Sequence, residues 1–531
     1  MTTGDLLKRV WLVLIPFAAL SALVAAVPAL GAAPAGPAAA TTCLGKPVTI
    51  VAGATVFRGT EGDDVVAMTP GGWGSFDALG GNDTICLAQI QRVPGDGEAR
   101  GRVDAGSGDD VVVNPPGTGA YSLDVGLGAG SDTFTGNSET RERVYAETAT
   151  DDYDGHTDPP PPGDQRDVID MGGGPYQPTY EPEWYADAVW SIAPPGAANA
   201  DRITFGPGGS FLYYTGTMAP GGSIDVSAAT QATLQLPKPG AAEPAARGDF
   251  LVDNVARRAE VGGVQVLAWQ GHIDTFNFGD KGEDDWKVPV SFLGSDARES
   301  LRFDYGTYGD VRLGGGDDYL ETSEYEPSRG LTFRSADGGP GRDTVALINR
   351  CATLTIRLAD TLTCEGTSVP FTGFESVYAT TRVADGRVKV VGTAADDDIE
   401  VRANQVTVDA GAGDDGVWPR GRKVRVNAGP GADHVDAQAQ DLVVRGQAGP
   451  DRISLAYPYD AVPGEIPRVR RWVALGGPGR DVLKGTRQKR QVGDRLIGGP
   501  GRDRADGDAG TRDYCDAEVT RRCERGPARR R

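Results

Sequence analysis

The chain has 531 residues, of which 76 are glycine, and its formal net charge is −21. This length exceeds what one hydrophobic core usually serves, so several domains or one long array of repeats are expected. The acidic balance disfavours nucleic acids and anionic membranes as partners and favours cations. Aromatic residues make up only 7%, which argues against large aromatic-filled cores.

The N-terminus has the pattern of a secretory signal. Lys8 and Arg9 precede an apolar run from Val10 to Leu30, and small residues follow up to Ala40. We therefore expect residues 1–40 to be a signal peptide, and the rest to be secreted, extracellular and without stable membrane insertion after cleavage. A retained membrane anchor is the alternative that the apolar length leaves open.

Glycine–aspartate turns begin soon after this segment. Residues 59–66 read GTEGDDVV, and related turns recur up to residue 134. Each turn leads into a few residues rich in Val, Ile or Leu, which is the composition of a short strand. Residues 41–150 are therefore predicted to form an N-terminal repeat segment of stacked turns and strands.

The repeat fades in the middle of the chain, which we assign to residues 151–300. Residues 158–163 form a proline-rich stretch, yet residues 202–205 and 272–278 still have the pattern of short strands. We predict a degenerate β-rich region with Pro/Gly-rich loops. A separate β-sandwich is the alternative.

Residues 301–515 return to glycine–aspartate turns and contain the strictest repeat. Between residues 392 and 454 the pattern recurs every 18 residues. The aspartates that anchor it are Asp397, Asp415, Asp433 and Asp451. A period kept over four copies predicts coils that stack and cover one another's apolar edges. Residues 516–531 are left as a basic tail.

The repeating turn combines an apolar residue with a carboxylate. We expect the apolar side chain to point inward, and the carboxylate and turn carbonyls to point outward into the gap between adjacent coils. Such a gap offers only oxygen ligands, which suits Ca²⁺ better than Mg²⁺ because Mg²⁺ demands stricter geometry and loses water reluctantly. The alternative is that each aspartate caps its own turn without a metal.

These turns resemble the hemolysin-type (RTX) calcium-binding nonapeptide repeat. Residues 338–346 and 476–484 fit its GGxGxDxUx pattern, and 498–506 fit except that Ala505 takes the apolar place. The resemblance covers scattered parts of 59–134 and 313–506. It implies an all-β fold, a parallel β-roll or β-solenoid of 18-residue coils, with Ca²⁺ held between successive turns. The calcium ligands it implies are Asp64, Asp83, Asp110, Asp132, Asp318, Asp343, Asp397, Asp415, Asp433, Asp451, Asp481 and Asp503.

Two departures from the family pattern shape this expectation. Within 392–454 the glycine turns recur every 18 residues rather than every nine, so calcium is expected on one rim only. Other turns, such as that of Asp318, have no second glycine–aspartate turn 18 residues away in the sequence, so no turn that could share a calcium ion with them is evident. Arg342, Arg480 and Arg502 each precede a candidate aspartate and offer an ion pair in place of calcium.

All six cysteines follow the signal. An even number in an exported chain suggests three disulfides, although spacing alone does not fix their pairing. Proximity in the sequence favours Cys43–Cys86, Cys351–Cys364 and Cys515–Cys523.

Catalytic patterns are scarce. The three histidines, His156, His272 and His434, stand in no HExxH motif, and no GxSxG is present. We therefore expect a structural or adhesive protein rather than an enzyme, with calcium ions and cell-surface or extracellular polysaccharide as partners. The alternative is an exported polysaccharide-active enzyme, a lyase or epimerase. Its candidate charged loop contains Asp280, Lys281, Glu283, Asp284, Asp285 and Lys287.

Overall fold

A computed structural model of the protein describes residues 42–53, 57–70, 74–88, 100–117, 122–147, 166–174, 186–193, 197–236, 248–279, 289–303, 308–323, 333–456, 471–486, 493–508 and 512–527. Throughout these ranges the regular structure is β, and no helix occurs. Accordingly, the described residues include no helix with the length and apolarity to cross a lipid bilayer. The expected signal peptide, His156 and the charged loop at 280–287 lie outside the described residues.

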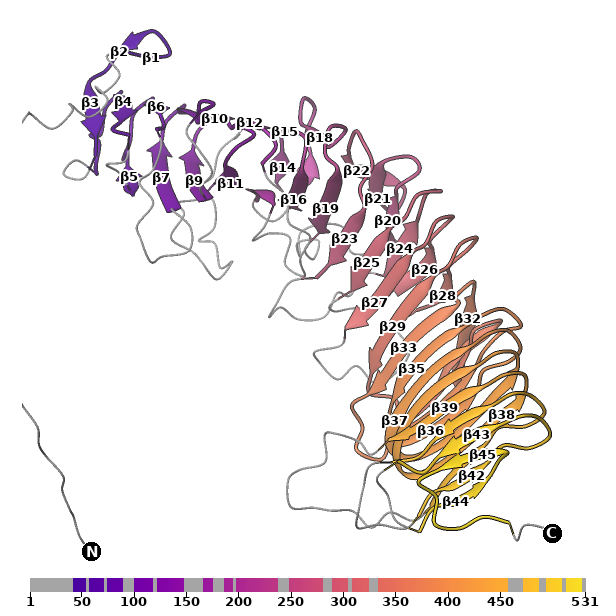
Figure 1. Cartoon of the computed structure of the whole chain (residues 1–531). Coiled ribbons are helices and arrows are strands. Elements are labelled where there is room, and N and C mark those ends of the chain that lie inside the picture. The colour runs from indigo at the N-terminus through magenta and orange to yellow at the C-terminus, as the bar shows by residue number, and fades with distance from the viewer. Residues whose placement is uncertain are drawn as a thin grey trace, which may run out of the picture. The chain divides into compact units, whose positions relative to one another are not determined.

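Short parallel strands stack into two sheets, which we call sheet A and sheet B (Figure 1). Sheet A begins with β3 (Ile50–Ala52), β4 (Val65–Met68), β6 (Thr84–Cys86), β8 (Val111–Val113), β10 (Thr133–Thr135), β12 (Val168–Met171), β15 (Arg202–Phe205) and β18 (Ser223–Asp225). Sheet B begins with β5 (Ser75–Asp77), β7 (Arg100–Ser107), β9 (Ser122–Ala129), β11 (Arg141–Tyr145), β13 (Asp187–Ser191), β16 (Gly209–Tyr214) and β19 (Gln231–Leu236). Because consecutive strands alternate between the sheets, the chain winds in coils, each stacked on the one before.

The same winding continues into the C-terminal half. Sheet B proceeds through β23 (Thr275–Phe278), β25 (Ser300–Phe303), β27 (Tyr319–Ser323), β29 (Thr344–Asn349), β33 (Ser376–Thr381) and β35 (Asp398–Arg402). On the side of sheet A, an isolated bridge from Asp225 to Gln270 follows β18, and parallel pairing resumes through β20 (Phe250–Asp253), β24 (Val290–Leu293), β26 (Tyr308–Arg312) and β28 (Ser335–Asp337). An antiparallel insertion then leads to β34 (Arg387–Val391) and β36 (Gln405–Asp409). Parallel pairing therefore runs across the expected boundaries near residues 150 and 300, through β10–β12, β11–β13 and β25–β27.

Two long strands, β37 (Gly416–Pro430) and β38 (His434–Ala448), each run through a turn and pair in both sheets. Beyond them sheet B ends with β39 (Arg452–Ala456), β41 (Val482–Lys484), β43 (Arg504–Asp506) and β45 (Val519–Arg521). Sheet A ends with β40 (Arg471–Leu475), β42 (Arg495–Ile497) and β44 (Tyr514–Asp516). All-β structure with parallel strands, as predicted, is confirmed.

Antiparallel insertions interrupt sheet A twice. The first joins β21 (Arg258–Val261) and β22 (Val264–Ala268) to β20, and the second joins β30 (Thr353–Arg357), β31 (Thr361–Cys364) and β32 (Thr367–Thr372). The remaining strands form two small pairs, β1 (Thr42–Cys43) with β2 (Lys46–Pro47) and β14 (Ala198–Asn199) with β17 (Thr217–Met218). The disulfides are Cys43–Cys86, Cys351–Cys364 and Cys515–Cys523, the pairings that sequence proximity favoured.

The 18-residue period arises from stacked apolar side chains inside the coils. Ile399, Val417, Val435 and Ile453 are successive partners in sheet B, and all four are fully buried. Because side chains alternate across a strand, every second residue joins this column and its neighbours face solvent. Each coil therefore covers its neighbour's apolar edge, which an isolated coil could not do.

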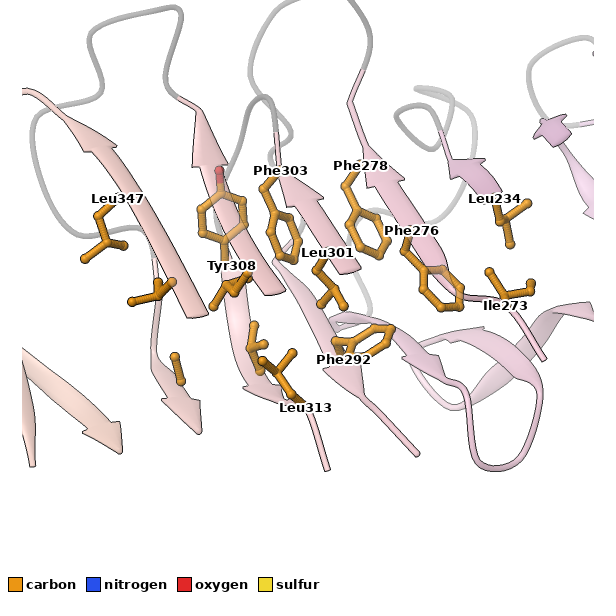
Figure 2. Close-up of a cluster of buried hydrophobic side chains, with 14 of the residues drawn as sticks. Leu234, Ile273, Phe276, Phe278, Phe292, Leu301, Phe303, Tyr308, Leu313 and Leu347 are labelled. Atoms are coloured by element: carbon orange, nitrogen blue, oxygen red, sulfur yellow. The ribbon is translucent and has the colours of Figure 1, made fainter. Parts of the chain in front are cut away.

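Aromatic side chains gather in one part of this interior (Figure 2). The rings of Phe278 and Phe303 stack at 4.7 Å between centroids, and Tyr308 lies 4.3 Å from Phe303. Phe276 meets Phe292 edge-on at 5.1 Å. The low aromatic content argued against large aromatic-filled cores, and this segment is a local exception to it, whereas other buried aromatic residues, such as Phe76, Phe134 and Trp472, lie along the rest of the coils.

Candidate functional site: ladders of buried carboxylates

The predicted aspartates of the strict repeat form a continuous hydrogen-bonded ladder. Each one immediately precedes a strand of sheet B and donates its backbone N–H to Oδ1 of the aspartate one coil later. The distances are 2.9 Å from Asp397 N to Asp415 Oδ1, 3.0 Å from Asp415 N to Asp433 Oδ1 and 3.1 Å from Asp433 N to Asp451 Oδ1. At the turn no neighbouring carbonyl takes this N–H, and a carboxylate supplies the acceptor that a buried donor requires.

These carboxylates lie between the coils and away from solvent. Asp397, Asp415, Asp433 and Asp451 are each at most 2% exposed. The carboxylates thus lie in the gap between adjacent coils, where the sequence placed them, but hydrogen bonding to the neighbouring coil keeps each side chain away from solvent.

The ladder extends in both directions along sheet B. Asp451 N donates to Asp481, Asp481 N donates to Asp503, and the run ends where Asp503 N donates to Glu518 Oε2 at 2.7 Å. An upstream run links Glu299, Asp318, Asp343 and Glu375 by the same contact. We call the two runs together the C-terminal ladder. The Asp318 turn thus has neighbours on both sides, at separations of 19 and 25 residues.

A second set, the N-terminal ladder, precedes the strands of sheet A. Its rungs are Asp64, Asp83, Asp110, Asp132, Asp167 and Asp201, joined by N–H to Oδ1 distances of 2.7–3.0 Å. Asp494 and Asp513 form a third, short ladder that ends on Glu524. Sequence reasoning missed Asp167, Asp201, Asp494 and Asp513. At these positions the sequence keeps only part of the motif: an aspartate stands two residues before an apolar residue that is buried, but no pair of glycines precedes the aspartate.

The glycines of the motif are required by close contacts. A Cβ at Gly476 would lie 2.2 Å from Asp481 Oδ2, so a side chain there would collide with the carboxylate. Gly477 has φ +123°, and a Cβ on it would lie 1.7 Å from the carbonyl oxygen of Gln447 on the neighbouring coil. The first glycine therefore makes room for the carboxylate, and the second allows both the left-handed backbone and the approach of the next coil.

The second oxygen of most ladder carboxylates has no partner. In the described part of the chain, Oδ2 is buried without a hydrogen bond in all twelve predicted aspartates except Asp64 and Asp397. In those two, a threonine four residues earlier donates its backbone N–H to Oδ2: Thr60 at 2.8 Å and Thr393 at 2.5 Å. In the other ten aspartates this position is not threonine, being glycine in eight of them and Leu79 or Gln447 in the other two, and Oδ2 keeps an unused acceptor.

Burial makes the negative charge of these groups unfavourable. Desolvation, with the neighbouring charges of Asp397 and Asp433, raises the pKa of Asp415 to about 7. Desolvation likewise raises the pKa of Asp110 to about 7 and that of Asp132 to about 8, with nearby aspartates adding to the shift. At neutral pH the ladders therefore hold carboxyl groups that favour a proton or a counter-ion.

Within the described ranges, basic side chains do not supply that counter-ion to the predicted aspartates. Among the described residues, none of the twelve predicted aspartates forms an ion pair with Lys or Arg. Arg342, proposed from the sequence as an internal substitute for calcium, instead bonds Asp398 at 2.5 Å on the exposed face of sheet B. The charge of the ladders is thus not neutralised within the described part of the protein.

An outer row of polar side chains runs beside the ladders. Its hydrogen bonds have the opposite direction, because here the backbone N–H of the later coil donates to a side chain of the earlier coil. Asp414 N donates to Asp396 Oδ1, and Ala432 N donates to Asp414 Oδ1, both at 2.7 Å. Asn82 and Asp109 repeat the arrangement near the N-terminus. A doubled aspartate such as Asp414–Asp415 therefore contributes one residue to the outer row and one to the buried ladder, which increases the negative charge along this edge.

The donor atoms at the ladder fit a hard cation. Beside Gly476, the position of an added Cβ is 2.2 Å from Asp481 Oδ2 and 2.6 Å from the carbonyl oxygen of Gly498, so a free carboxylate oxygen and a carbonyl of the next coil meet there. Neither sulfur nor imidazole belongs to the ladders defined above. An all-oxygen set of carboxylates and carbonyls is the ligand type that Ca²⁺ prefers.

The turns at the other end of each 18-residue coil differ in chemistry. A polar groove of about 250 Å³ crosses them. Its lining residues are Asp385, Asn404, Gln405, Arg422, Lys423, Gln440 and Asp441. Both signs of charge occur here, and the glycine–aspartate arrangement does not. Of the histidines, His272 Nε2 lies 3.8 Å from Asp274 Oδ1, and His434 is exposed beside Trp418.

Comparison with known proteins gives no family for this chain: no family model matches it, and no curated protein matches it significantly. The resemblance of its turns to the RTX repeat therefore stays an expectation from the sequence.

Proposed function

We propose that this protein is a secreted, calcium-binding β-roll of the RTX type with a structural or adhesive role. The observation that carries the proposal is the row of buried, unpartnered Oδ2 atoms on stacked coils, with no basic side chain against them in the described residues. Asp415, Asp433, Asp451 and Asp481 would hold ions in the C-terminal ladder, together with turn carbonyls. Calcium would supply the positive charge that the ladders lack.

The ions would act through linkage between binding and folding. A cation that binds stacked turns but not the unfolded chain stabilises the fold by mass action, by about 2.7 kcal/mol per site at a free concentration of 100 Kd. Low calcium inside the cell would leave the acidic chain loosely folded for export, and higher calcium outside would complete folding. Three disulfides suit the same oxidising location.

The competing explanation is that the ladders work without metal. A protonated carboxyl group could donate from Oδ2 to a nearby turn carbonyl, and the ladder would then be a purely structural device. This explanation requires several carboxyl groups to be protonated at physiological pH. Their pKa values are raised to about 6 to 8, so only a fraction of these groups is protonated at that pH.

Ion counting separates the two explanations. Purified protein stripped with EDTA would be dialysed against Ca²⁺ at pH 7.5, and bound metal would be measured by mass spectrometry, with excess Mg²⁺ as competitor. We expect several Ca²⁺ ions per chain, retained against Mg²⁺. Binding of no calcium by a folded protein would refute the proposal.

A further inference from the structure

Three carboxylates from different coils converge where the N-terminal ladder ends. Glu147 follows β11 of sheet B, whereas Asp167 and Asp201 precede β12 and β15 of sheet A. One oxygen from each lies within 4.8 Å of the other two. All three side chains are buried, with Glu147 5%, Asp167 0% and Asp201 1% exposed.

Neighbouring groups hold two of these carboxylates in place. Ser191 Oγ donates to Asp201 Oδ2 at 2.7 Å, and Asn199 Nδ2 donates to that same hydroxyl at 2.7 Å. The backbone N–H of Ile192 donates to Glu147 Oε2 at 2.6 Å. The cluster is therefore positioned by hydrogen bonds before any ligand arrives.

Asp167 has binding capacity left over. Its Oδ1 accepts from Asp132 N at 2.8 Å, but its Oδ2 is buried without a hydrogen-bond partner. Among the residues that the structure describes, no Lys or Arg forms an ion pair with any of the three carboxylates. Three negative charges enclosed together repel one another strongly unless a cation or protons intervene.

We propose that Glu147, Asp167 and Asp201 form a discrete buried site for a divalent cation of the calcium class. Ca²⁺–oxygen bonds of about 2.3–2.6 Å place ligand oxygens up to roughly 5 Å apart, which the cluster satisfies. Unlike a ladder site, this one draws ligands from both sheets and uses no glycine pair. The ion would tie the end of β11 to the turns before β12 and β15. Asp167 and Asp201 are also the last two rungs of the N-terminal ladder, but the C-terminal ladder contains none of the three residues, so this site and the ions proposed there can fail independently.

Tyr214 offers a local reporter for this site. Its ring is buried, and its hydroxyl lies 3.5 Å from the carbonyl oxygen of Asn199, the residue that contacts Ser191. Burial, followed by the charges of Asp201 and Glu147, raises the pKa of the Tyr214 hydroxyl, as expected for a phenol beside these carboxylates. A bound Tb³⁺ ion, which takes calcium sites, would therefore receive excitation energy from Tyr214.

The test uses Tb³⁺ luminescence and metal counting on the EDTA-stripped full chain. We expect Glu147→Gln and Asp201→Asn each to lose about one bound ion and the Tyr214-dependent part of the emission. Tyr214→Phe should lose that emission but keep the ion count. The matched variant Asp433→Asn, in the C-terminal ladder, should keep the Tyr214-dependent emission whatever happens to the ladder ions.

Two results would overturn the proposal. One is an unchanged ion count and unchanged Tyr214-dependent emission in both carboxylate variants, which would mean that the three groups share protons instead. The second result applies if the carboxylate variants do not fold. In that case, equal Tb³⁺ emission from the unsubstituted protein and from Tyr214→Phe would show that no ion lies beside Tyr214.

Discussion

The backbone N–H of Asp397 donates to Oδ1 of Asp415 at 2.9 Å, across the boundary between two coils. The same contact recurs from rung to rung and gives most ladder carboxylates, Asp415 among them, two separable roles. Oδ1 accepts a backbone N–H that has no carbonyl partner. Oδ2 is buried, shares the negative charge of the carboxylate and has no hydrogen-bond partner. Predictions that distinguish these roles test the function directly.

Replacing Asp415 with Asn separates hydrogen bonding from charge. The amide keeps an acceptor at Oδ1 and removes the buried charge, so the calcium-free variant should unfold at the same temperature as the unsubstituted protein or higher. In saturating calcium the variant should lose about 1–3 kcal/mol of the stabilisation, the range for leaving a buried polar site incomplete. Thermal unfolding with EDTA and with Ca²⁺ measures both. Asp414→Asn, on the exposed neighbour, is the control and should retain most of the calcium effect. Equal destabilisation of Asp415→Asn in both conditions would contradict the account.

Stability without calcium should fall as pH rises. Burial raises the pKa of Asp110 from 3.8 to about 7 and that of Asp132 from 3.8 to about 8. A group whose folded-state pKa is raised contributes stability that is fully present below its unfolded pKa and is lost as pH rises through the folded value. The midpoint temperature in EDTA should therefore drop between pH 5 and pH 8.5, and calcium should flatten or reverse the trend. A flat profile in EDTA would show that the ladder carboxyls are not perturbed.

Glycine in the turn motif should be essential for stability where the backbone of the neighbouring coil lies in contact with it. Gly339 has φ +100°, and an added Cβ would lie 1.9 Å from the carbonyl oxygen of Gly314. Gly339→Ala combines backbone strain with overpacking, and we expect a loss of about 2–5 kcal/mol. Gly366→Ala is the matched control, because Gly366 has φ +88° but open space around its Cβ position, so only about 1–2 kcal/mol should be lost. Denaturant unfolding measures both, and equal losses would argue against tight coil stacking.

The disulfide Cys351–Cys364 should stabilise the antiparallel insertion in which it lies. It joins residues 13 apart, just before β30 and at the end of β31. Replacing both cysteines with Ser should cost about 2–4 kcal/mol and should increase amide hydrogen exchange in β30–β32. The equivalent change at Cys515 and Cys523 should affect mainly β44 and β45, near the C-terminus. An unchanged exchange pattern in β30–β32 would show that the sheet alone holds the insertion.

Periodicity in the sequence was sufficient to predict stacked parallel strands, because Val417 and its partners recur in exact register with Asp415 and its partners. Local proximity was likewise enough for the disulfides. The rungs without glycines were not predictable, since Asp167 and Asp201 are separated by insertions of varying length and only the fold restores their alignment. Neither could the sequence place Glu147, which comes from the other sheet. The longer side chains of Glu375 and Glu518 also replace aspartate as acceptors, a substitution that a Gly-x-Asp pattern does not detect.

A crystal structure of the protein grown with Ca²⁺ replaced by Tb³⁺ tests the central claim most directly, through the anomalous scattering of the metal. The account predicts anomalous peaks beside Oδ2 of Asp415, Asp433 and Asp451, in contact with turn carbonyls of adjacent coils. A well-ordered ladder with no peaks, and with Oδ2 at hydrogen-bond distance from a carbonyl oxygen, would contradict it. In that case the aspartates would be protonated structural rungs.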